Sequence, residues 1–132
     1  MSKTSVNIGR LYESVVRFEL EKHGWNVFEP RGIETAHIDM IAAKWKDGKL
    51  LLRAIQVKAR TGLGTRYGSF DVYFEYKDDN YYYAVVFDSE DLKDLHIWLI
   101  PSKAVPEKIH KMIHIDDFPE FKGENGFKNL EH

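Results

Sequence analysis

Three residues in the middle of the chain carry side chains suited to chemistry on a phosphate ester: Asp39, Gln56 and Lys58. Mg²⁺ prefers oxygen ligands and is often held by only one or two carboxylates. Asp39 could therefore anchor the ion, with the Gln56 amide oxygen and the backbone carbonyl of Val57 as weaker ligands. Lys58 could orient or deprotonate an attacking water, or stabilise charge in the transition state. The structural alternative is an ordinary cross-strand ion pair between Asp39 and Lys58.

A predicted β-hairpin would bring these residues together. Residues 36–45 and 50–60 are apolar-rich runs, and Asp47-Gly48 between them favours a two-residue type I′ turn. In that register Asp39 opposes Gln56, and His37 opposes Lys58. The four polar side chains then share one face, and the other face holds an apolar set: Ile38, Met40, Ile55 and Val57. The apolar face should fix the register, because a one-residue slip would bury the polar set; a β-bulge would break this arrangement.

The remaining pattern predicts a helix, then strands. A helix beginning at Thr4 or Ser5 should end near His23, where Gly24 supplies a stop. Further strands are predicted over 25–28, 81–88 and 96–101, a loop over 61–68, a strand or flap over 70–76, and a short helix over 104–111. The order is therefore αβββ followed by more β structure.

Glu13 is an unusual member of the helix. It falls in a helical series whose other members are apolar or very small: Val6, Gly9, Val16 and Leu20. A carboxylate beside a buried stripe usually has a partner. The alternative is a simple i,i+4 ion pair with Arg17.

A helix with Glu, a strand, a strand with Asp, and a strand with Gln-x-Lys together resemble the PD-(D/E)XK nuclease superfamily, which includes restriction endonucleases and archaeal Holliday junction resolvases. The matching segments are Gly9-Arg10-Leu11-Tyr12-Glu13, Gly24-Trp25-Asn26-Val27, His37-Ile38-Asp39-Met40-Ile41 and Ile55-Gln56-Val57-Lys58-Ala59-Arg60. The resemblance implies an α/β, restriction endonuclease-like αβββ core with a central mixed sheet flanked by helices.

The resemblance also implies site roles and partners. Asp39 looks like the metal-binding Asp, Gln56 like the variable acidic position, Lys58 like the catalytic lysine and Glu13 like the helix glutamate. The implied activity is that of an endonuclease that hydrolyses DNA with Mg²⁺, for which Mn²⁺ may substitute, and without an organic cofactor. RNA stays open as a substrate because the phosphate chemistry is shared. A homodimer is expected, since duplex cutters and junction resolvases act on two strands.

Two residues depart from the family pattern. Ile38 replaces the proline, and Gln56 replaces a carboxylate, as in the Asp…Gln-x-Lys variant of some type IV restriction-like nucleases. A neutral amide holds a divalent ion less strongly, so metal binding would depend more on Glu13 and the DNA phosphate. Gln56 also leaves open a catalytically inactive nuclease-fold domain that binds DNA or serves in assembly.

The charge distribution is uneven. The 132 residues carry a net charge of −2, which alone would disfavour a polyanionic partner. Residues 44–66, however, carry seven basic side chains against one acidic, and residues 71–124 carry six against thirteen. Such a dipole can steer DNA to one surface; the alternative is a lysine-rich hairpin edge that blocks aggregation. The expected DNA contacts are Arg10, His37, Lys44, Arg60 and Arg66, the last two from a glycine-rich loop.

Composition excludes several other classes. The absence of cysteine excludes disulfides, thiolate metal sites and cysteine nucleophiles, and it fits a cytoplasmic location. We expect no membrane span or signal peptide. Residues 1–129 should form a single domain, and Leu130-Glu131-His132 resembles an expression-tag remnant.

Histidines and tyrosines give weaker signals. His110 and His114 stand four residues apart, a metal spacing on a helix, but the sequence around His114 favours a strand. The tyrosines could stack unpaired bases, although strand propensity and core packing explain them equally well. They are Tyr67, Tyr73, Tyr76, Tyr81, Tyr82 and Tyr83.

Overall fold

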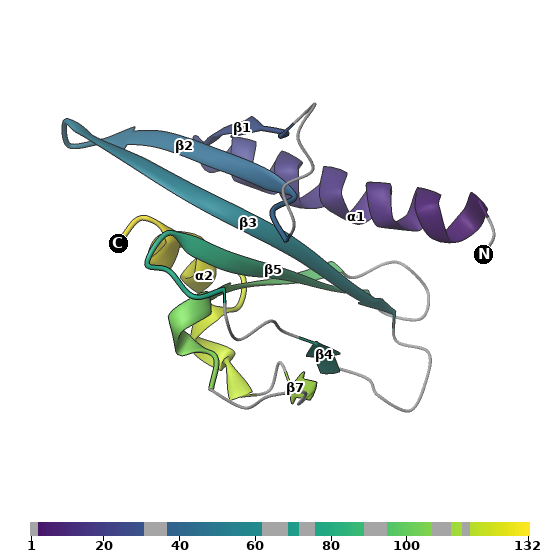
Figure 1. Ribbon diagram of the computed structural model, residues 1–132. Helices are drawn as coiled ribbons and strands as arrows, with labels where there is room; N and C mark the ends of the chain where they lie inside the picture. The colour runs from purple at the N-terminus through teal and green to yellow at the C-terminus, as the bar shows by residue number, and fades with distance from the viewer. Residues whose placement is uncertain are drawn as a thin grey trace.

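The computed structural model describes residues 3–30, 37–61, 69–71, 76–88, 95–106, 112–114 and 117–132. Its elements are α1 (Lys3–Lys22), β1 (Asn26–Phe28), β2 (Met40–Lys46), β3 (Lys49–Thr61), β4 (Ser69–Asp71), β5 (Tyr81–Asp88), β6 (Leu95–Pro101), β7 (Met112–His114) and α2 (Glu124–Leu130), with short 3₁₀ helices η1 (Ser102–Ala104) and η3 (Pro119–Phe121) (Figure 1). No helix in the described part of the chain is long and apolar enough to cross a membrane.

Five strands form a mixed sheet in the order β1-β2-β3-β5-β6. Strands β3 and β5 run parallel, and the other neighbours are antiparallel. The helices α1 and α2 flank the sheet, which confirms the predicted α/β class with a central mixed sheet (Figure 1). Strands β4 and β7 pair separately, so the strand prediction for His114 is confirmed.

Both helices cover one face of the sheet. Tyr12, Val16 and Leu20 recur at helical spacing along α1 and are buried in one core with Phe127 and Leu130 of α2. Gly24 ends the α1 segment with φ +89°, a backbone conformation that favours glycine. Because this core holds α1 over β2, β3 and β5, it fixes where the acidic side chain on α1 can reach.

The hairpin prediction is confirmed from its turn to Met40. Asp47 and Gly48 have φ values of +51° and +78°, as a type I′ turn requires. The pairs run from Lys46↔Lys49 to Met40↔Ile55, the predicted register.

Beyond Met40 the predicted register is wrong. The Asp39 N–H donates to the Ile55 carbonyl oxygen at 2.8 Å, although Met40 already pairs with Ile55. Asp39 and Met40 thus both face Ile55 where β2 begins, an irregularity of the β-bulge kind. The bulge reverses the alternation before Met40, so Ile38 packs in the core on the other face of the sheet, away from Met40 and Ile55. The predicted direct opposition of Asp39 to Gln56 is therefore lost.

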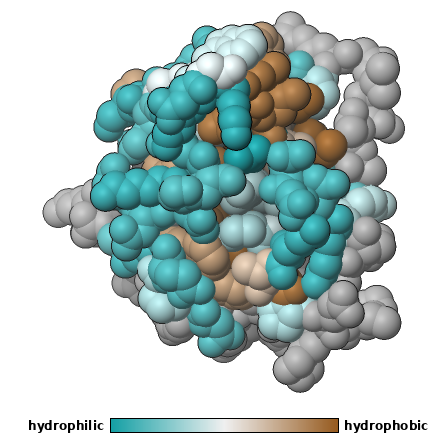
Figure 2. Space-filling view, turned by 90° about the vertical axis from the view of Figure 1, so that its left-hand side faces the viewer, coloured by the Kyte–Doolittle hydropathy of each residue, from teal (hydrophilic) through white to brown (hydrophobic). Residues whose placement is uncertain are grey.

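The other sheet face is only partly covered. Its core is built on β5 and β6 and includes Tyr83, Phe87 and Trp98. Over β1, β2 and β3 the same face leaves four large apolar side chains exposed by 48–69%: Phe28, Trp45, Leu50 and Leu52. Figure 2 views the molecule from the side where the hairpin turn lies in Figure 1, and apolar side chains gather there on the surface near the top. We call these four residues the apolar sheet face.

Leu130, which we set apart from the domain, contributes to the core. Its side chain is fully buried, and Arg53 Nε donates to its carbonyl oxygen at 2.9 Å. Glu131 Oε1 forms an ion pair with Lys44 Nζ at 3.1 Å. The interpretation of residues 130–132 as a tag remnant stays a prediction about their origin.

Several predictions fall largely outside the described residues. Of the predicted loop over 61–68, only Thr61 is described, at the end of β3. Of the predicted helix over 104–111, Ala104 ends a 3₁₀ helix and Val105 is extended, and residues 107–111, including His110, are not described.

Candidate functional site

Asp39 directly precedes β2, just before the first residue that pairs with β3. Its Oδ2 accepts a hydrogen bond from the Val57 N–H at 2.7 Å. The Ala54 N–H donates toward β5, to the Asn80 carbonyl at 2.7 Å, so the peptide groups of odd-numbered β3 residues face β2. The N–H and carbonyl of Val57 thus point to the same edge of β3 as the Asp39 carboxylate. The bulge at Asp39 produces this meeting of carboxylate and carbonyl.

Glu13 lies on α1, within electrostatic reach of Asp39. Burial raises the pKa of Glu13 above its ordinary value, and the negative charges of Asp39 and Glu29 raise it further, while Arg10 opposes the shift. The charges of Glu13 and Asp39 are therefore close enough to repel each other. Arg17 pairs with Glu21 and Glu29, at 3.6 and 3.3 Å. A partly buried carboxylate with a raised pKa beside a second carboxylate marks a candidate functional site, and a bound cation would neutralise both charges.

Gln56 belongs to a network on the other face of β3. The Tyr81 hydroxyl lies 2.6 Å from the His37 carbonyl, to which it donates, and 3.0 Å from Gln56 Oε1. Gln56 Nε2 is 3.5 Å from His37 Nδ1. Burial raises the pKa of Tyr81 well above its ordinary value, so this phenol keeps its proton and remains a donor. The structure thus brings His37 to Gln56, as predicted, but through Tyr81 and not through a regular ladder.

Lys58 follows two residues after Gln56 and is partly buried. By strand alternation its side chain leaves the sheet on the Gln56 side. The site therefore has two halves: Asp39, Glu13 and the Val57 carbonyl at the edge of β3, and Gln56 with Lys58 on the face turned away from α1.

The predicted DNA contacts are scattered. Arg10 is exposed and lies within electrostatic reach of Glu13. Arg60 is placed by its backbone only, at the far end of β3, and Arg66 lies outside the described residues. His37 sits beside Gln56, with φ +67°.

Lys44 has structural contacts instead. Its Nζ donates to the His23 carbonyl at 2.8 Å and lies 3.1 Å from Glu131 and 5.7 Å from the centre of the Trp25 ring. These contacts tie β2 to the end of α1 and to the residue after α2, which gives Lys44 a structural role.

The donor set at the edge of β3 fits Mg²⁺. Among the described residues no three His, Asp or Glu side chains form a metal-binding group by themselves. Mg²⁺ nevertheless is commonly held by one or two carboxylates, with waters and substrate phosphates completing its shell. Asp39, Glu13 and the Val57 carbonyl supply two carboxylates and one neutral oxygen, which meets that need.

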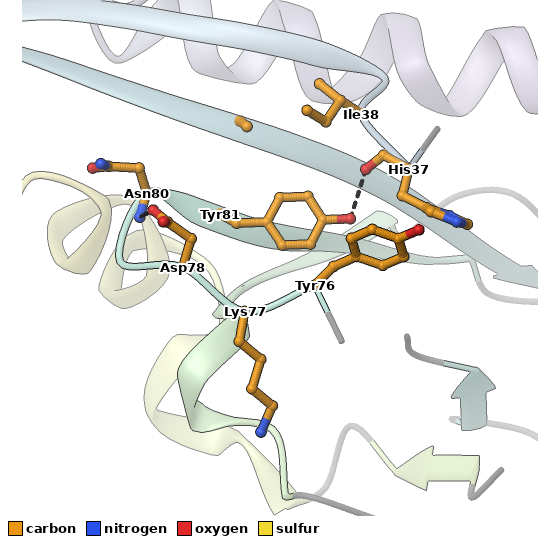
Figure 3. A pocket seen from close by; sticks show the side chains of 8 residues that line it. His37, Ile38, Tyr76, Lys77, Asp78, Asn80 and Tyr81 are labelled. Carbon is orange, nitrogen blue, oxygen red and sulfur yellow. Dashed lines mark hydrogen bonds between the residues drawn. The ribbon is translucent and has the colours of Figure 1, made fainter. Parts of the chain in front are cut away.

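A pocket of about 430 Å³ adjoins the Gln56 network (Figure 3). It is lined by His37, Ile38, Ala54, Tyr76, Lys77, Asp78, Asn80 and Tyr81. The sequence raises base stacking for Tyr76 and Tyr81 but does not place either residue beside Gln56. The connecting signal is the parallel pairing of β3 with β5, which sequence periodicity does not report.

The comparisons with known proteins show a shared fold. No family model and no curated protein matches the chain. A solved structure described as that of a bacterial homing endonuclease, I-Ssp6803I, matches with a TM-score of 0.56 and 18% sequence identity. The match covers 99% of this chain and 94% of that chain. The described elements thus form a fold similar to that of a known nuclease.

Proposed function

We propose that this protein is a divalent-metal-dependent endonuclease of the PD-(D/E)XK type that hydrolyses phosphodiester bonds in DNA. The observation that carries the proposal is the Asp39 carboxylate held against the Val57 N–H of β3, within electrostatic reach of Glu13 and with Lys58 on the same strand. The fold it shares with a homing endonuclease supports the same conclusion. We also propose that the protein acts in the cytoplasm.

Asp39, Glu13 and the Val57 carbonyl would hold Mg²⁺ or Mn²⁺. The bound ion would act as a Lewis acid on the phosphate and lower the pKa of a coordinated water. The Val57 N–H orients the Asp39 carboxylate through Oδ2, which leaves Oδ1 as a ligand. Burial, and then the charge of Asp39, raise the pKa of Glu13, and a bound cation would offset both effects.

Gln56 and Lys58 act on the other side of β3. The Gln56 amide is held by Tyr81 and His37 on the face away from the carboxylates, so its proposed role is to orient a water and not to bind the ion directly. The Lys58 ammonium stabilises negative charge on the phosphate in the transition state. Arg10, Arg60 and Arg66 are proposed to contact DNA phosphates, and His37 the nucleotide beside the cut.

We also propose a homodimer through the apolar sheet face. With aromatic side chains offering roughly 150–250 Å² each, the four exposed residues present on the order of 500 Å² of apolar surface. A stable interface buries about 800 Å² per partner, so this patch with its polar rim is large enough for a second copy. A patch of this size is among the largest that a monomer exposes, and such a patch often marks a functional contact surface. Two copies would also supply the two active sites that cutting both strands requires.

A nicking assay tests the enzyme. Supercoiled plasmid and a four-way junction are incubated with Mg²⁺ or EDTA, using wild type, Asp39→Asn and Lys58→Ala. Matched controls are Asp117→Asn and Lys49→Ala, an exposed carboxylate and an exposed lysine elsewhere. We expect EDTA to abolish cleavage and each site variant to lose about 10²–10³-fold in rate, while both controls cleave normally.

Cleavage that survives Asp39→Asn would contradict the site assignment. The alternative function is a catalytically inactive nuclease-fold domain, which Gln56 in place of a carboxylate favours. Salt-sensitive DNA binding without metal-dependent cleavage on either substrate would support that alternative.

A further inference from the structure

The pocket beside Gln56 has the size and lining of a site for one nucleobase. Its volume of about 430 Å³ is within the range of small-molecule sites. Three rings surround it, from His37, Tyr76 and Tyr81, and Ile38 and Ala54 provide an apolar wall. We propose that it receives one unpaired base of the nucleic acid. That base would lie next to the phosphate bound by the metal ion that Asp39 is proposed to hold. This inference rests on the proposed function for its substrate.

The chemistry of the lining favours a base over a phosphate. Figure 3 shows the Tyr76 and Tyr81 rings at the pocket, while the Lys77 ammonium points away from them. Lys77 Nζ instead donates to the Val105 carbonyl at 2.7 Å. The Asn80 side chain is also turned aside, since its Oδ1 accepts a hydrogen bond from Arg53 at 2.8 Å. Stacking on aromatic rings tolerates any base, so we expect little preference among the four bases.

Hydrogen bonds preform the wall between residues 76 and 80. The Asp78 N–H donates to Ser102 Oγ at 3.0 Å, and that hydroxyl donates back to the Asp78 carbonyl at 2.9 Å. The Asn80 carbonyl accepts from the Ala54 N–H at 2.7 Å. A preformed pocket binds its ligand without first ordering a segment.

His37 forms the side of the pocket nearest the metal site. Its φ of +67° is uncommon for a residue other than glycine, and the hydrogen bond from Tyr81 to its carbonyl, at 2.6 Å, holds it there. Its ring packs against Tyr76 with centroids 4.5 Å apart. A backbone conformation of this kind, at a residue between a pocket and the proposed metal site, is typical of functional positions.

The position of the pocket predicts which DNA binds best. Gln56 contacts Tyr81 at the pocket, and the next residue, Val57, bonds to Asp39, so the two sites are anchored on consecutive residues of β3. Taking a base out of a duplex costs a few kcal/mol, and least when the base is already unpaired. We therefore expect DNA with a single unpaired base beside the cut to bind more tightly than fully paired DNA.

The test measures binding with the Asp39→Asn variant, which prevents cleavage. Duplexes with and without one unpaired 2-aminopurine are titrated with this variant, alone and combined with Tyr76→Ala, Tyr76→Phe or Phe18→Ala. Tyr76 is 39% exposed, so its loss should not unfold the protein. Phe18→Ala is the matched control, because it removes an exposed ring from α1.

We expect at least tenfold tighter binding of the DNA with the unpaired base, with a change in 2-aminopurine fluorescence on binding. Tyr76→Ala should abolish that preference, and Tyr76→Phe and Phe18→Ala should keep it. Equal affinity for both duplexes, or a preference that survives Tyr76→Ala, would overturn the inference. If wild type cleaves DNA in a metal-dependent way but the preference is absent or survives Tyr76→Ala, only the base pocket is contradicted. If the preference depends on Tyr76 but no cleavage occurs, only the nuclease activity is contradicted.

Discussion

At the scale of single residues, the charged form of Glu13 is destabilised in the folded protein. Burial and then the charge of Asp39 raise its pKa above 4.5, so the folded protein holds this proton more tightly than the unfolded chain. As pH rises from about 4.5 through the raised pKa, the unfolded state binds fewer protons, and the free energy of unfolding falls. A bound divalent ion should restore that stability.

The prediction for Glu13 follows directly. Glu13→Gln removes the charge, so at neutral pH without metal this variant should melt at a higher temperature than wild type. Added Mg²⁺ should raise the melting temperature of wild type but much less that of the variant. Thermal unfolding from acid to neutral pH, with and without Mg²⁺, measures both effects. Glu120→Gln, at an exposed carboxylate, is the control; equal stabilisation of wild type and Glu13→Gln by Mg²⁺ would exclude Glu13 as a ligand.

At the scale of elements, the short helix α2 depends on contacts far from it in sequence. Leu130 is fully buried, and Arg53 of β3 bonds both to its carbonyl and to Asn80. Gly126 also lies so close to η3 that an added Cβ would stand 2.3 Å from the Phe121 carbonyl oxygen. The helix is thus fitted tightly against β6 and η3.

Truncation of Leu130 tests this role. Leu130→Ala should lower the free energy of unfolding by about 2–5 kcal/mol, because it leaves a cavity under α2. Lys128→Ala, at an exposed position of the same helix, should change it by less than about 0.5 kcal/mol. Urea unfolding measures both, and similar values for the two variants would show that α2 does not belong to the cooperative core.

Local patterns predicted the elements better than their junctions. Asp47-Gly48 and the flanking alternation determine the hairpin register, since both act between near neighbours. The bulge at Asp39 has no local signal, because a single extra residue leaves the composition of the strand unchanged. The contact of Tyr81 with Gln56 depends on a parallel pairing across 25 residues, which periodicity cannot report.

At the scale of the whole molecule, folding redistributes the basic segment. The sequence assigned its positive charge to the hairpin, yet Lys44 and Lys46 pair with Glu131, and Arg53 is buried. Of the basic side chains proposed to act on DNA, Lys58 and Arg60 belong to the other end of β3 and Arg10 belongs to α1. The hairpin end presents the apolar sheet face instead.

Substitutions on the apolar sheet face test the proposed dimer. Trp45→Lys combined with Leu52→Lys should convert a dimer to a monomer, because two buried charges would oppose association. Phe18→Lys, at an exposed ring on α1, should leave the dimer intact. Analytical ultracentrifugation over a range of concentrations measures the mass. A wild-type protein that stays monomeric at high concentration would contradict the proposed interface.

The central claim is a divalent metal site built by α1, the bulge before β2, and β3. Crystals soaked in Mn²⁺ test it most directly, because anomalous scattering locates that ion without ambiguity. We predict an anomalous peak at ligand distance from the Asp39 carboxylate and the Val57 carbonyl, with Glu13 reaching it and Lys58 nearby, and no peak in Asp39→Asn crystals. Saturating Mn²⁺ that leaves this place empty, or binds only elsewhere, would contradict the claim.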